Sequence, residues 1–483
     1  MRTIGTPSTQ ARKLNAIASG ALPNGDPVVV NADGTVSVVG VDNDAAPSIG
    51  PETVFNTGSY TERPVGVYDA SANRVVLAYT GNSTGSARGH AIVGQISGSN
   101  ITFGTTVIFN SGSVEYIAID YDSANSKVVI AYSDEDISNY GRAIVGTVSG
   151  DSISFGSMAT FRTSQIYYNH IAYDTNAQKF LFVYSYQGSS GRSVVATVSG
   201  TSISFGSEEI WSSNQAAPRD IAYDANAQKF LMVFTDQPNT YDGTGVVATI
   251  SGTSVSYGSE AVFASGTVQQ AELAYNPDSG KFAISFSDQN DSSKLKSCVA
   301  TVSGTSVSYG AAVTLTASSV NLGGICYNGD VDKIILTYEN NSDGFIKSRE
   351  GTMSGTSISF GTERTLLSRD TQHITNFIDT STNTVVVAYR RKLPDPDTGD
   401  CFTYTAINSN LTSENYIGLS SNGYPDTAGA TIDVQGAIND RQSGLTAGQS
   451  YYVQTDGTLD TTPASPSVFA GTAISATKMI VKG

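Results

Sequence analysis

The sequence has few charged side chains, and the basic ones are in the minority. Charged residues make up 14% of the 483 positions, and 27 Lys and Arg stand against 43 Asp and Glu, which gives a net charge of −16. Proteins that bind a nucleic-acid backbone need clustered Lys and Arg, and this composition does not provide them. We therefore expect no nucleic-acid partner.

Cysteine and histidine are also scarce. The three cysteines share no metal-binding or disulfide spacing, so we expect small buried apolar side chains, with a Cys298–Cys326 bridge as the alternative. His170 and His373 could approach each other at the centre of a ring, but two ligands are too few for a protein metal site. The sequence predicts neither a bound metal nor a cofactor.

Long apolar segments are missing as well. No run of about 18 apolar residues is present that could cross a bilayer. The first 21 residues contain Arg2, Arg12 and Lys13 but lack the apolar centre of a secretory signal. We expect no membrane insertion, and if the protein acts outside a cell, something other than a signal peptide takes it there.

The main feature that the sequence does have is a long internal repeat. An aromatic residue returns every 50 to 53 residues or so, and a second aromatic keeps the same period, which is near the longest propeller repeats. The first set is Tyr68, Tyr121, Tyr173, Tyr223, Tyr275 and Tyr327, with Ile378 in the seventh place; the second is Tyr79, Tyr132, Tyr184, Phe234, Phe286, Tyr338 and Tyr389. Two anchors with one period predict seven similar units.

Each unit is predicted to contain four strands, a to d. In the third unit they are residues 170–173, 180–184, 194–198 and 203–211. β-Branched and aromatic residues fill these segments, and Gly, Asn, Asp and Ser separate them. No segment keeps a helical period over several turns, so the predicted fold class is all-β.

The outer strands indicate how the array closes. Strand d carries an aromatic–Gly pair that occurs six times, from Gly104 to Gly361, and an orphan Ile49-Gly50 with Phe55 behind it stands before the first unit. This N-terminal strand can complete the last blade, and radial closure leaves only short edges. Residues 48–414 are therefore predicted to form a seven-bladed β-propeller. An open β-solenoid is the alternative, but it gives no reason for the orphan strand.

The two flanks of the ring lack the repeat. Residues 1–47 are predicted to form an arm and a β-hairpin, and residues 415–483 a small all-β module. Both flanks contain a Gly, a strand-like run and Asp-Gly-Thr at one spacing, from Gly25 to Asp33 and from Gly448 to Asp456. Asp-Gly between apolar runs is a strong hairpin signal.

Three sequence segments in the flanks resemble segments of a known protein family. They are Leu22-Pro-Asn-Gly-Asp-Pro-Val-Val-Val-Asn-Ala-Asp-Gly-Thr-Val, Gln442-Ser-Gly-Leu-Thr-Ala-Gly-Gln-Ser-Tyr-Tyr-Val-Gln-Thr-Asp-Gly-Thr-Leu and Gly471-Thr-Ala-Ile-Ser-Ala-Thr-Lys-Met-Ile-Val-Lys. They resemble segments of tailed-phage virion proteins, many of them tail fibres, above all those of cyanophages and other marine phages. The resemblance covers about a quarter of the chain. It implies a structural or adhesive role on a phage particle and brings no catalytic motif.

The recurring Asp in Tyr-Asp-x-x-x-x-Lys, as in residues 173–179, has two interpretations. It could hold a cation or ligand, but an Asp that bonds its own backbone in a tight a–b turn accounts better for its recurrence. A propeller enzyme would need carboxylates with Tyr or His around one end of the channel, and none is evident in matching register. We expect no enzymatic activity, although fold alone does not exclude it.

The b–c loops differ in length and content between units, whereas the a–b and c–d turns are short and uniform. The b–c and d–a loops of a four-stranded blade share one face, and binding residues concentrate on loops held by a rigid scaffold; drift of unconstrained loops is the alternative. Tyrosine has a flat apolar face and a hydroxyl, which suits sugar rings. The candidate binding residues are Tyr60, Tyr116, Tyr140, Tyr167, Tyr168, Tyr186, Tyr241 and Arg391.

Together these features predict a tailed-phage virion protein, a fibre or spike component or surface adhesin, whose propeller attaches to a host-surface glycan or protein. Expected partners are other virion proteins and further copies of the chain; a trimer is common among fibres, but no heptad or triple-helical pattern supports one. Assembly in the host cytoplasm would explain the missing signal and unpaired cysteines. The alternatives are a carbohydrate-active enzyme such as a depolymerase, and a purely structural tail or capsid-surface protein.

Overall fold

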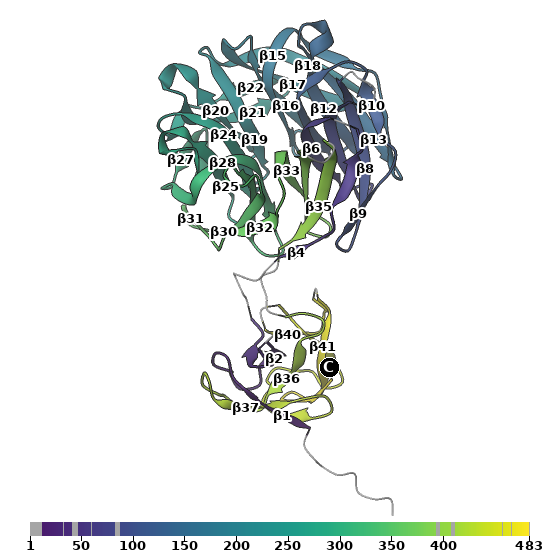
Figure 1. The fold of residues 1–483 in the computed structure, drawn as a ribbon, viewed down its shortest axis with the longest axis vertical. Coiled ribbons are helices and arrows are strands. Elements are labelled where there is room, and N and C mark those ends of the chain that lie inside the picture. Colours follow the sequence, from purple (N-terminus) through teal and green to yellow (C-terminus); the bar gives the residue numbers. More distant parts are fainter. Residues whose placement is uncertain are drawn as a thin grey trace, which may run out of the picture. The chain divides into compact units, whose positions relative to one another are not determined.

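The computed structural model describes residues 12–31, 33–40, 47–58, 60–82, 87–392, 397–406, 411–455, 457–464 and 466–482. Most of these residues lie in β-strands, and the described ranges contain no α-helix and only three short 3-10 turns, η1 (Glu135–Ile137), η2 (Gln237–Asn239) and η3 (Gln289–Asp291) (Figure 1). The chain divides into two compact units. One is Pro47–Ala406, called the propeller here, and the other, called the flank unit, combines Met1–Ala46 with Ile407–Gly483.

Seven four-stranded antiparallel blades make up the described part of the propeller. The inner strands are β6 (Thr61–Asp69), β11 (Val114–Asp122), the second half of β15 (Ala159–Asp174), β19 (Ala216–Asp224), β24 (Val268–Asn276), the second half of β28 (Val313–Asn328) and β33 (Thr371–Asp379). Each inner strand contacts the inner strands of both neighbouring blades, and β33 contacts β6. The inner strands therefore form a closed ring.

Two further strands in each blade complete its centre. The second strands are β7 (Arg74–Asn82), β12 (Lys127–Asp134), β16 (Lys179–Tyr186), β20 (Lys229–Asp236), β25 (Lys281–Asp288), β29 (Lys333–Asn340) and β34 (Thr384–Arg391). The third strands are β8 (Ala87–Ser97), β13 (Tyr140–Ser149), β17 (Ser190–Ser199), β21 (Asp242–Ser251), β26 (Lys294–Ser303), β30 (Ile346–Ser354) and β35 (Gly399–Thr405).

The outer strand is usually split in two, and in blades two and five its second part continues into the next inner strand. The outer strands are β9 (Asn100–Phe103) with β10 (Val107–Asn110), β14 (Ser152–Phe155) with the start of β15, β18 (Ser202–Ser212), β22 (Ser254–Tyr257) with β23 (Ala261–Ala264), β27 (Ser306–Tyr309) with the start of β28, and β31 (Ser357–Phe360) with β32 (Arg364–Leu367). Their pairing with the third strand of the same blade is antiparallel throughout.

The N-terminal strand closes the ring. β4 (Ser48–Ile49) and β5 (Thr53–Asn56) pair with β35, the third strand of blade seven. The register places Thr405 opposite Ser48 and Tyr404 opposite Ile49. The predicted seven-bladed propeller with an N-terminal closing strand is therefore confirmed, and the open solenoid is wrong.

The repeated aromatic–Gly pairs join neighbouring blades. A side chain at Gly104 would collide with the backbone of Asp151, which lies in the c–d turn of the next blade. The orphan Gly50 stands in the same relation to Ser99 of blade one. Glycine is thus required because the outer strand of one blade lies directly against the next turn, and Gly50 makes this contact across the closure.

The recurring Asp closes the a–b turn, as predicted. Asp174 Oδ1 accepts hydrogen bonds from the backbone N–H groups of Asn176 at 2.9 Å and Ala177 at 2.7 Å. The equivalent carboxylates or amides do the same in the other blades, at Asp69, Asp122, Asp224, Asn276, Asn328 and Asp379. These oxygens are occupied by the backbone, so the motif is a turn and not a ligand site.

The second aromatic of each repeat lies in the blade core. Tyr79, Tyr132, Tyr184, Phe234, Phe286, Tyr338 and Tyr389 are all at most 1% exposed. Several hydroxyls reach carboxylates, as Tyr184 does with Glu208 at 2.7 Å and Tyr389 with Glu52 at 2.7 Å. Because a buried tyrosine needs a partner for its hydroxyl, these pairs fix the ring in place.

The flank unit corrects the predicted domain organisation. Residues 1–47 and 415–483 were expected to form separate modules on either side of a ring that ended at residue 414. In the structure one sheet contains β1 (Lys13–Ile17), β2 (Pro27–Val30), β3 (Val36–Val38), β36 (Tyr416–Ser420) and β37 (Gly429–Asp433), so both ends of the chain pair with each other. The ring unit ends at Ala406 because Leu411 and Tyr416 pack into the flank core.

A second small sheet completes the flank unit. It consists of β38 (Ile438–Asn439), β39 (Ser450–Val453), β40 (Leu459–Asp460), β41 (Val468–Ser475) and β42 (Lys478–Val481). The two predicted hairpins are present as β2–β3 and β39–β40, and they share a turn pattern, with backbone bonds from Gly34 to Asn31 and from Gly457 to Gln454.

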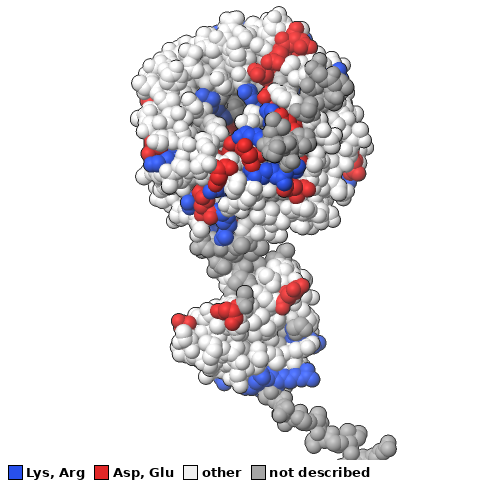
Figure 2. Space-filling view, in the orientation of Figure 1, with Lys and Arg blue, Asp and Glu red and all other residues white. Residues whose placement is uncertain are grey.

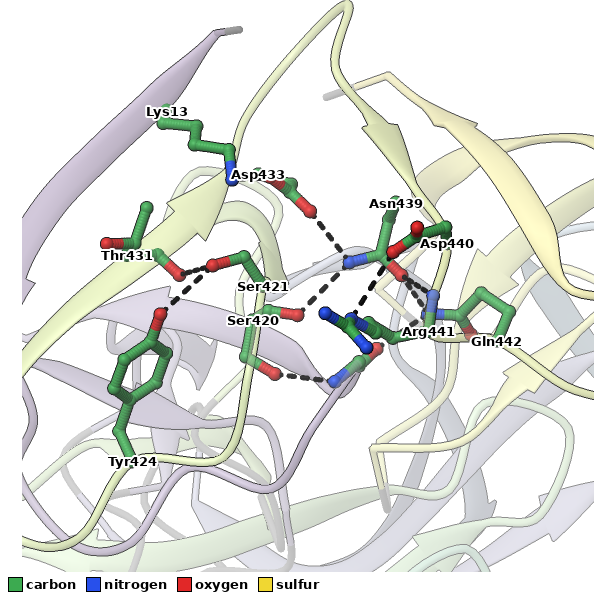
Figure 3. Close-up of polar contacts among 11 residues, drawn as sticks. Lys13, Ser420, Ser421, Tyr424, Thr431, Asp433, Asn439, Asp440, Arg441 and Gln442 are labelled. Carbon is green, nitrogen blue, oxygen red and sulfur yellow. Dashed lines mark hydrogen bonds and ion pairs between the residues drawn. The ribbon is translucent and has the colours of Figure 1, made fainter.

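Polar contacts also tie the two ends of the chain together (Figure 3). Asn439 Nδ2 donates to the backbone oxygen of Ser420 at 3.1 Å and to Asp433 at 2.9 Å, and Asp433 lies 3.8 Å from the ammonium of Lys13. Gln442 Nε2 donates to the backbone oxygen of Gly25 at 2.8 Å. These residues come from both flanks, so neither flank has a complete set of partners alone.

The three cysteines form no bridge. Cys298, Cys326 and Cys401 are buried and free, so the alternative bridge between the first two is not formed. Within the described ranges, none of the helical segments has the length and apolar character needed to cross a membrane.

Candidate ligand site in the propeller channel

Each inner strand has a bulge close to its start, where its pairing with the second strand is interrupted. In four successive blades, seven, one, two and three, the bulge holds a non-glycine residue at positive φ: His373 at 51°, Arg63 at 45°, Tyr116 at 48° and Tyr168 at 51°. Such conformations cost free energy and persist where the surrounding structure imposes them, often at functional sites. The bulges redirect these side chains at one end of the channel.

A cavity of about 720 Å³ occupies this end of the channel. Its lining includes the bulge residues, the inner strands that follow them and Glu339 at the end of β29, so it opens toward the b–c and d–a loops. Figure 2 shows charged side chains of both signs gathered around the centre of the propeller, while most of the surrounding surface is uncharged. The volume is in the range of small-molecule sites.

Two arginines and two tyrosines form a row across blades one to four, which we call the Arg–Tyr ladder. The Arg63 guanidinium lies 5.2 Å from the centroid of the Tyr116 ring, and Tyr116 packs on Tyr168 with centroids 5.2 Å apart. The guanidinium of Arg219 lies 5.0 Å from the Tyr168 ring. All four residues line the cavity. Stacking over an aromatic face fixes a guanidinium while leaving its N–H edge available.

Three polar side chains also line the cavity, each three residues before the first aromatic of its unit, and we call them the channel triad. They are His170 in blade three, Asp220 in blade four and Glu272 in blade five. His170 Nδ1 lies 3.8 Å from Asp220 Oδ1, and these side chains are 29% and 21% exposed. The Asp220 carboxylate accepts from the backbone N–H groups of Ile221 and Leu273, both at 2.7 Å, which joins blades four and five.

The surroundings of the channel triad suppress its charge. Burial raises the pKa of Asp220 to about 7, and burial followed by repulsion from Asp220 raises the pKa of Glu272 well above its usual range. Burial, with Arg219 nearby, lowers the pKa of His170 to about 4. Near neutral pH the imidazole is therefore uncharged, and both carboxyl groups bind a proton more readily than an exposed carboxylate does.

Three of the candidate tyrosines pack against one another at the cavity, and the others lie elsewhere on the propeller. Tyr116 and Tyr168 line the cavity, and Tyr167 packs against both, with centroids 6.0 Å and 6.4 Å away. The guanidinium of Arg390 lies 5.2 Å from the centroid of the Tyr60 ring, and Tyr60 does not line the cavity. Sequence position alone had put all of them on one face, whereas the structure gathers three into one cluster.

The other candidates do not line the cavity. Tyr186 lies between two arginines, Arg162 at 4.2 Å and Arg192 at 5.2 Å. Tyr140 begins β13, and Tyr241 follows η2 and is 48% exposed. The predicted Arg391 forms ion pairs with Asp400 at 2.6 Å and Glu52 at 3.4 Å, so its charge is already balanced.

Sequence reasoning missed the carboxylates of the channel. The expectation that no carboxylates with His stand in matching register was wrong, because His170, Asp220 and Glu272 each lie three residues before the first aromatic of their unit. Aligning the seven units at that position would have found them. His170 in blade three and His373 in blade seven both line the cavity. Among the described residues no group of three His, Cys, Asp or Glu side chains has a geometry suited to a metal ion.

Comparisons with known proteins find solved structures of distant similarity. No family model matches the chain, and no curated protein matches its sequence. The Cps50 (Swd1) β-propeller domain of Myceliophteria thermophila is 9% identical and covers 73% of this chain and 99% of its own, with a TM-score of 0.47. The periplasmic gluconolactonase PpgL of Pseudomonas aeruginosa is 11% identical, covers 74% and 97%, and has a TM-score of 0.49. A Dyadobacter fermentans protein of unknown function is 11% identical, covers 74% of this chain and 99% of its own, and has a TM-score of 0.48.

Proposed function

We propose that the chain is an attachment subunit of a tailed-phage particle and that the mouth of its propeller channel binds a glycan of the host surface. The observation that carries the binding half of this proposal is the cavity lined by the Arg–Tyr ladder and the channel triad. Backbone strain at four successive bulges supports the same location, since strain of this kind tends to be kept where it serves a site.

The chemistry of the lining suits a polyhydroxylated ligand. Tyrosine rings supply apolar surface for the C–H faces of a sugar, and guanidinium and carboxyl groups supply donors and acceptors for its hydroxyls. Gln270 and Asn321 add amide groups to the lining. Gln270 Oε1 accepts from the backbone N–H of Leu322 at 2.8 Å and Asn321 Nδ2 donates to Glu339 at 3.2 Å, which leaves the other group of each amide for a ligand. Rigid strands hold these groups, while loops of differing length surround the opening.

The particle half of the proposal is supported by the flank unit. Its segments carry the strings that resemble virion proteins, and it folds as a compact unit distinct from the ring. Partners in this proposal are other virion proteins and further copies of the chain through the flank unit, and a host glycan through the propeller. Labelling intact particles with an antibody raised against the propeller tests this half, and particles without label would contradict it.

The binding half is tested by measuring binding of the full chain, which contains the propeller at residues 47–406, to an array of bacterial surface polysaccharides. Wild-type protein is expected to bind a subset, and Tyr116→Ala and Tyr168→Ala to weaken that binding at least tenfold. Tyr241→Ala is the matched control, because Tyr241 is an exposed tyrosine on the propeller that does not line the cavity. Retained binding in both channel variants would place the site elsewhere.

A carbohydrate-active enzyme is the second candidate, and the channel triad is the observation that favours it. Two carboxyl groups with raised pKa values, beside a neutral imidazole, are groups from which general acid–base catalysis is built. Any glycan that binds is to be checked for shortened products. Product formation that disappears in Glu272→Gln would favour the enzyme, and intact glycan after long incubation would favour attachment.

A further inference from the structure

Neither arginine of the Arg–Tyr ladder has a carboxylate partner among the described residues. No Asp or Glu of the described chain lies within 4 Å of the guanidinium of Arg63 or Arg219, although the protein has 43 acidic residues against 27 basic ones. Other arginines that stack on tyrosines in the propeller are paired: Arg162 and Arg192 with Glu208, and Arg390 with Glu62 and Asp397. The ladder therefore presents cations that the protein leaves uncompensated.

The N–H edges of these guanidiniums are largely unused. Arg219 donates from Nε to Thr235 Oγ1 at 2.8 Å, which leaves its terminal nitrogens, and Arg63 is exposed at the rim. Burial lowers the pKa of Arg219, although Tyr168, Tyr116 and Glu272 nearby oppose that shift. Stacking on Tyr168 and Tyr116 sets the plane in which each edge faces the cavity.

The acidic groups of the channel do not cancel this charge. Burial raises the pKa values of Asp220 and Glu272, which disfavours their charged forms, and Glu339 pairs with the ammonium of Lys392 at 3.2 Å. Glu115 lies close enough to Arg63 for its pKa to respond, but burial raises that pKa. The mouth of the channel thus keeps positive charge in a protein whose net charge is −16.

We propose that the channel mouth selects acidic sugars, with Arg63 and Arg219 each binding a sugar carboxylate through the free edge of its guanidinium. This inference rests on the proposed glycan-binding function and names its ligand class. Planar carboxylates match the fork of a guanidinium, and the tyrosines between the two arginines cover the apolar faces of the sugar rings. Because the two arginines come from blades one and four, a ligand with carboxylates on more than one sugar residue fits best.

Matched probes test the selection. The full chain is titrated with oligosaccharides of galacturonate, glucuronate and mannuronate, and with the same oligosaccharides after reduction of every carboxyl to a primary alcohol. At least one acidic member is expected to bind ten times or more tighter than its reduced form, since hydrogen bonds between charged groups are among the stronger ones. Arg63→Gln is expected to remove most of that difference, and Arg63→Lys to restore part of it.

Controls separate the charge of the ladder from charge in general. Arg192→Gln removes an arginine that also stacks on a tyrosine but is paired with Glu208 and does not line the cavity, so acidic binding is expected to stay within twofold. Polyglutamate carries carboxylates without sugar rings and is expected to bind weakly. Polyglutamate binding as tight as that of the best oligosaccharide would overturn the inference.

The remaining outcomes distinguish this inference from the proposed function. Equal binding of acidic and reduced oligosaccharides would overturn the acidic selection and leave glycan binding standing. Absence of binding to every member of the set, together with an array without response, would overturn both. A wild-type preference that survives in Arg63→Gln and Arg219→Gln alike would assign acidic recognition to another surface of the chain.

Discussion

At the scale of single residues, the channel owes its character to side chains in unusual backbone conformations. Tyr116 and Tyr168 were predicted as candidate binding residues from loop position and residue type. Their placement at positive φ inside strand bulges could not be predicted, because Tyr and Arg have no preference for that region and the bulge is imposed by the ring. The channel triad was visible in the repeat register but is recognisable only when the inner strands are known to line one cavity.

Replacing Arg63 at its bulge by glycine is expected to change the stability of the fold and the affinity for ligand in opposite directions. Arg63→Gly is expected to stabilise the fold by about 0.5–1 kcal/mol, because glycine adopts positive φ without strain, and to weaken binding of the ligand tenfold. Gln178→Gly is the matched control: Gln178 has φ 55° in an exposed a–b turn away from the cavity, so the same gain is expected with unchanged binding. Thermal unfolding and ligand titration measure the two effects. A loss of stability in Arg63→Gly alone would show that its side chain supports the fold.

At the scale of elements, repeated short motifs were predictable in place and only partly in role. The Asp turns and the strand boundaries follow from local pattern, which is why the sequence predicted them. The aromatic–Gly pair was recognised in the sequence as a repeated feature of strand d. Its actual partner, the c–d turn of the next blade, depends on the angle between blades, which no local pattern encodes.

The closing strand can be tested at its glycine. Gly50→Ala would place a methyl group against the backbone of Ser99, so we expect a loss of about 2 kcal/mol from crowding at the contact between blades seven and one. Gly329→Ala is the control, because Gly329 has only ordinary van der Waals contact with Tyr327 and an unstrained backbone. Urea unfolding of both variants gives the comparison. Equal stability would mean that the closing strand moves aside at little cost.

At the scale of the whole molecule, the flank unit is the feature that the sequence did not predict. Its hairpins were predictable because their signals are local. The pairing of β1 with β37, which sets Lys13 opposite Asp433, joins segments more than 400 residues apart, and no periodicity reports such a pairing. The seven-fold count succeeded for the opposite reason, since a ring repeats the same neighbour relation and one orphan strand reveals its closure.

The flank unit is expected to fold without the propeller. The chain leaves it after Val39 and returns at Leu411, and both side chains belong to one hydrophobic cluster. Replacing residues 41–410 by a short Gly/Ser linker should therefore give a protein with a cooperative unfolding transition, and residues 47–406 should fold separately. Circular dichroism and calorimetry measure both products. A shortened chain without cooperative unfolding would mean that the flank strands depend on the ring.

The pairing of Ser48 with Thr405 places the two ends of the propeller side by side. The ring therefore occupies the position of a loop between two strands of another domain, and any domain whose ends meet in this way could occupy the same place. In a particle protein of the proposed kind, one recombination event on each side of the ring would exchange the entire recognition domain and leave the particle-bound part intact. Host range could then change by cassette replacement, independently of the slower change of single residues in the channel.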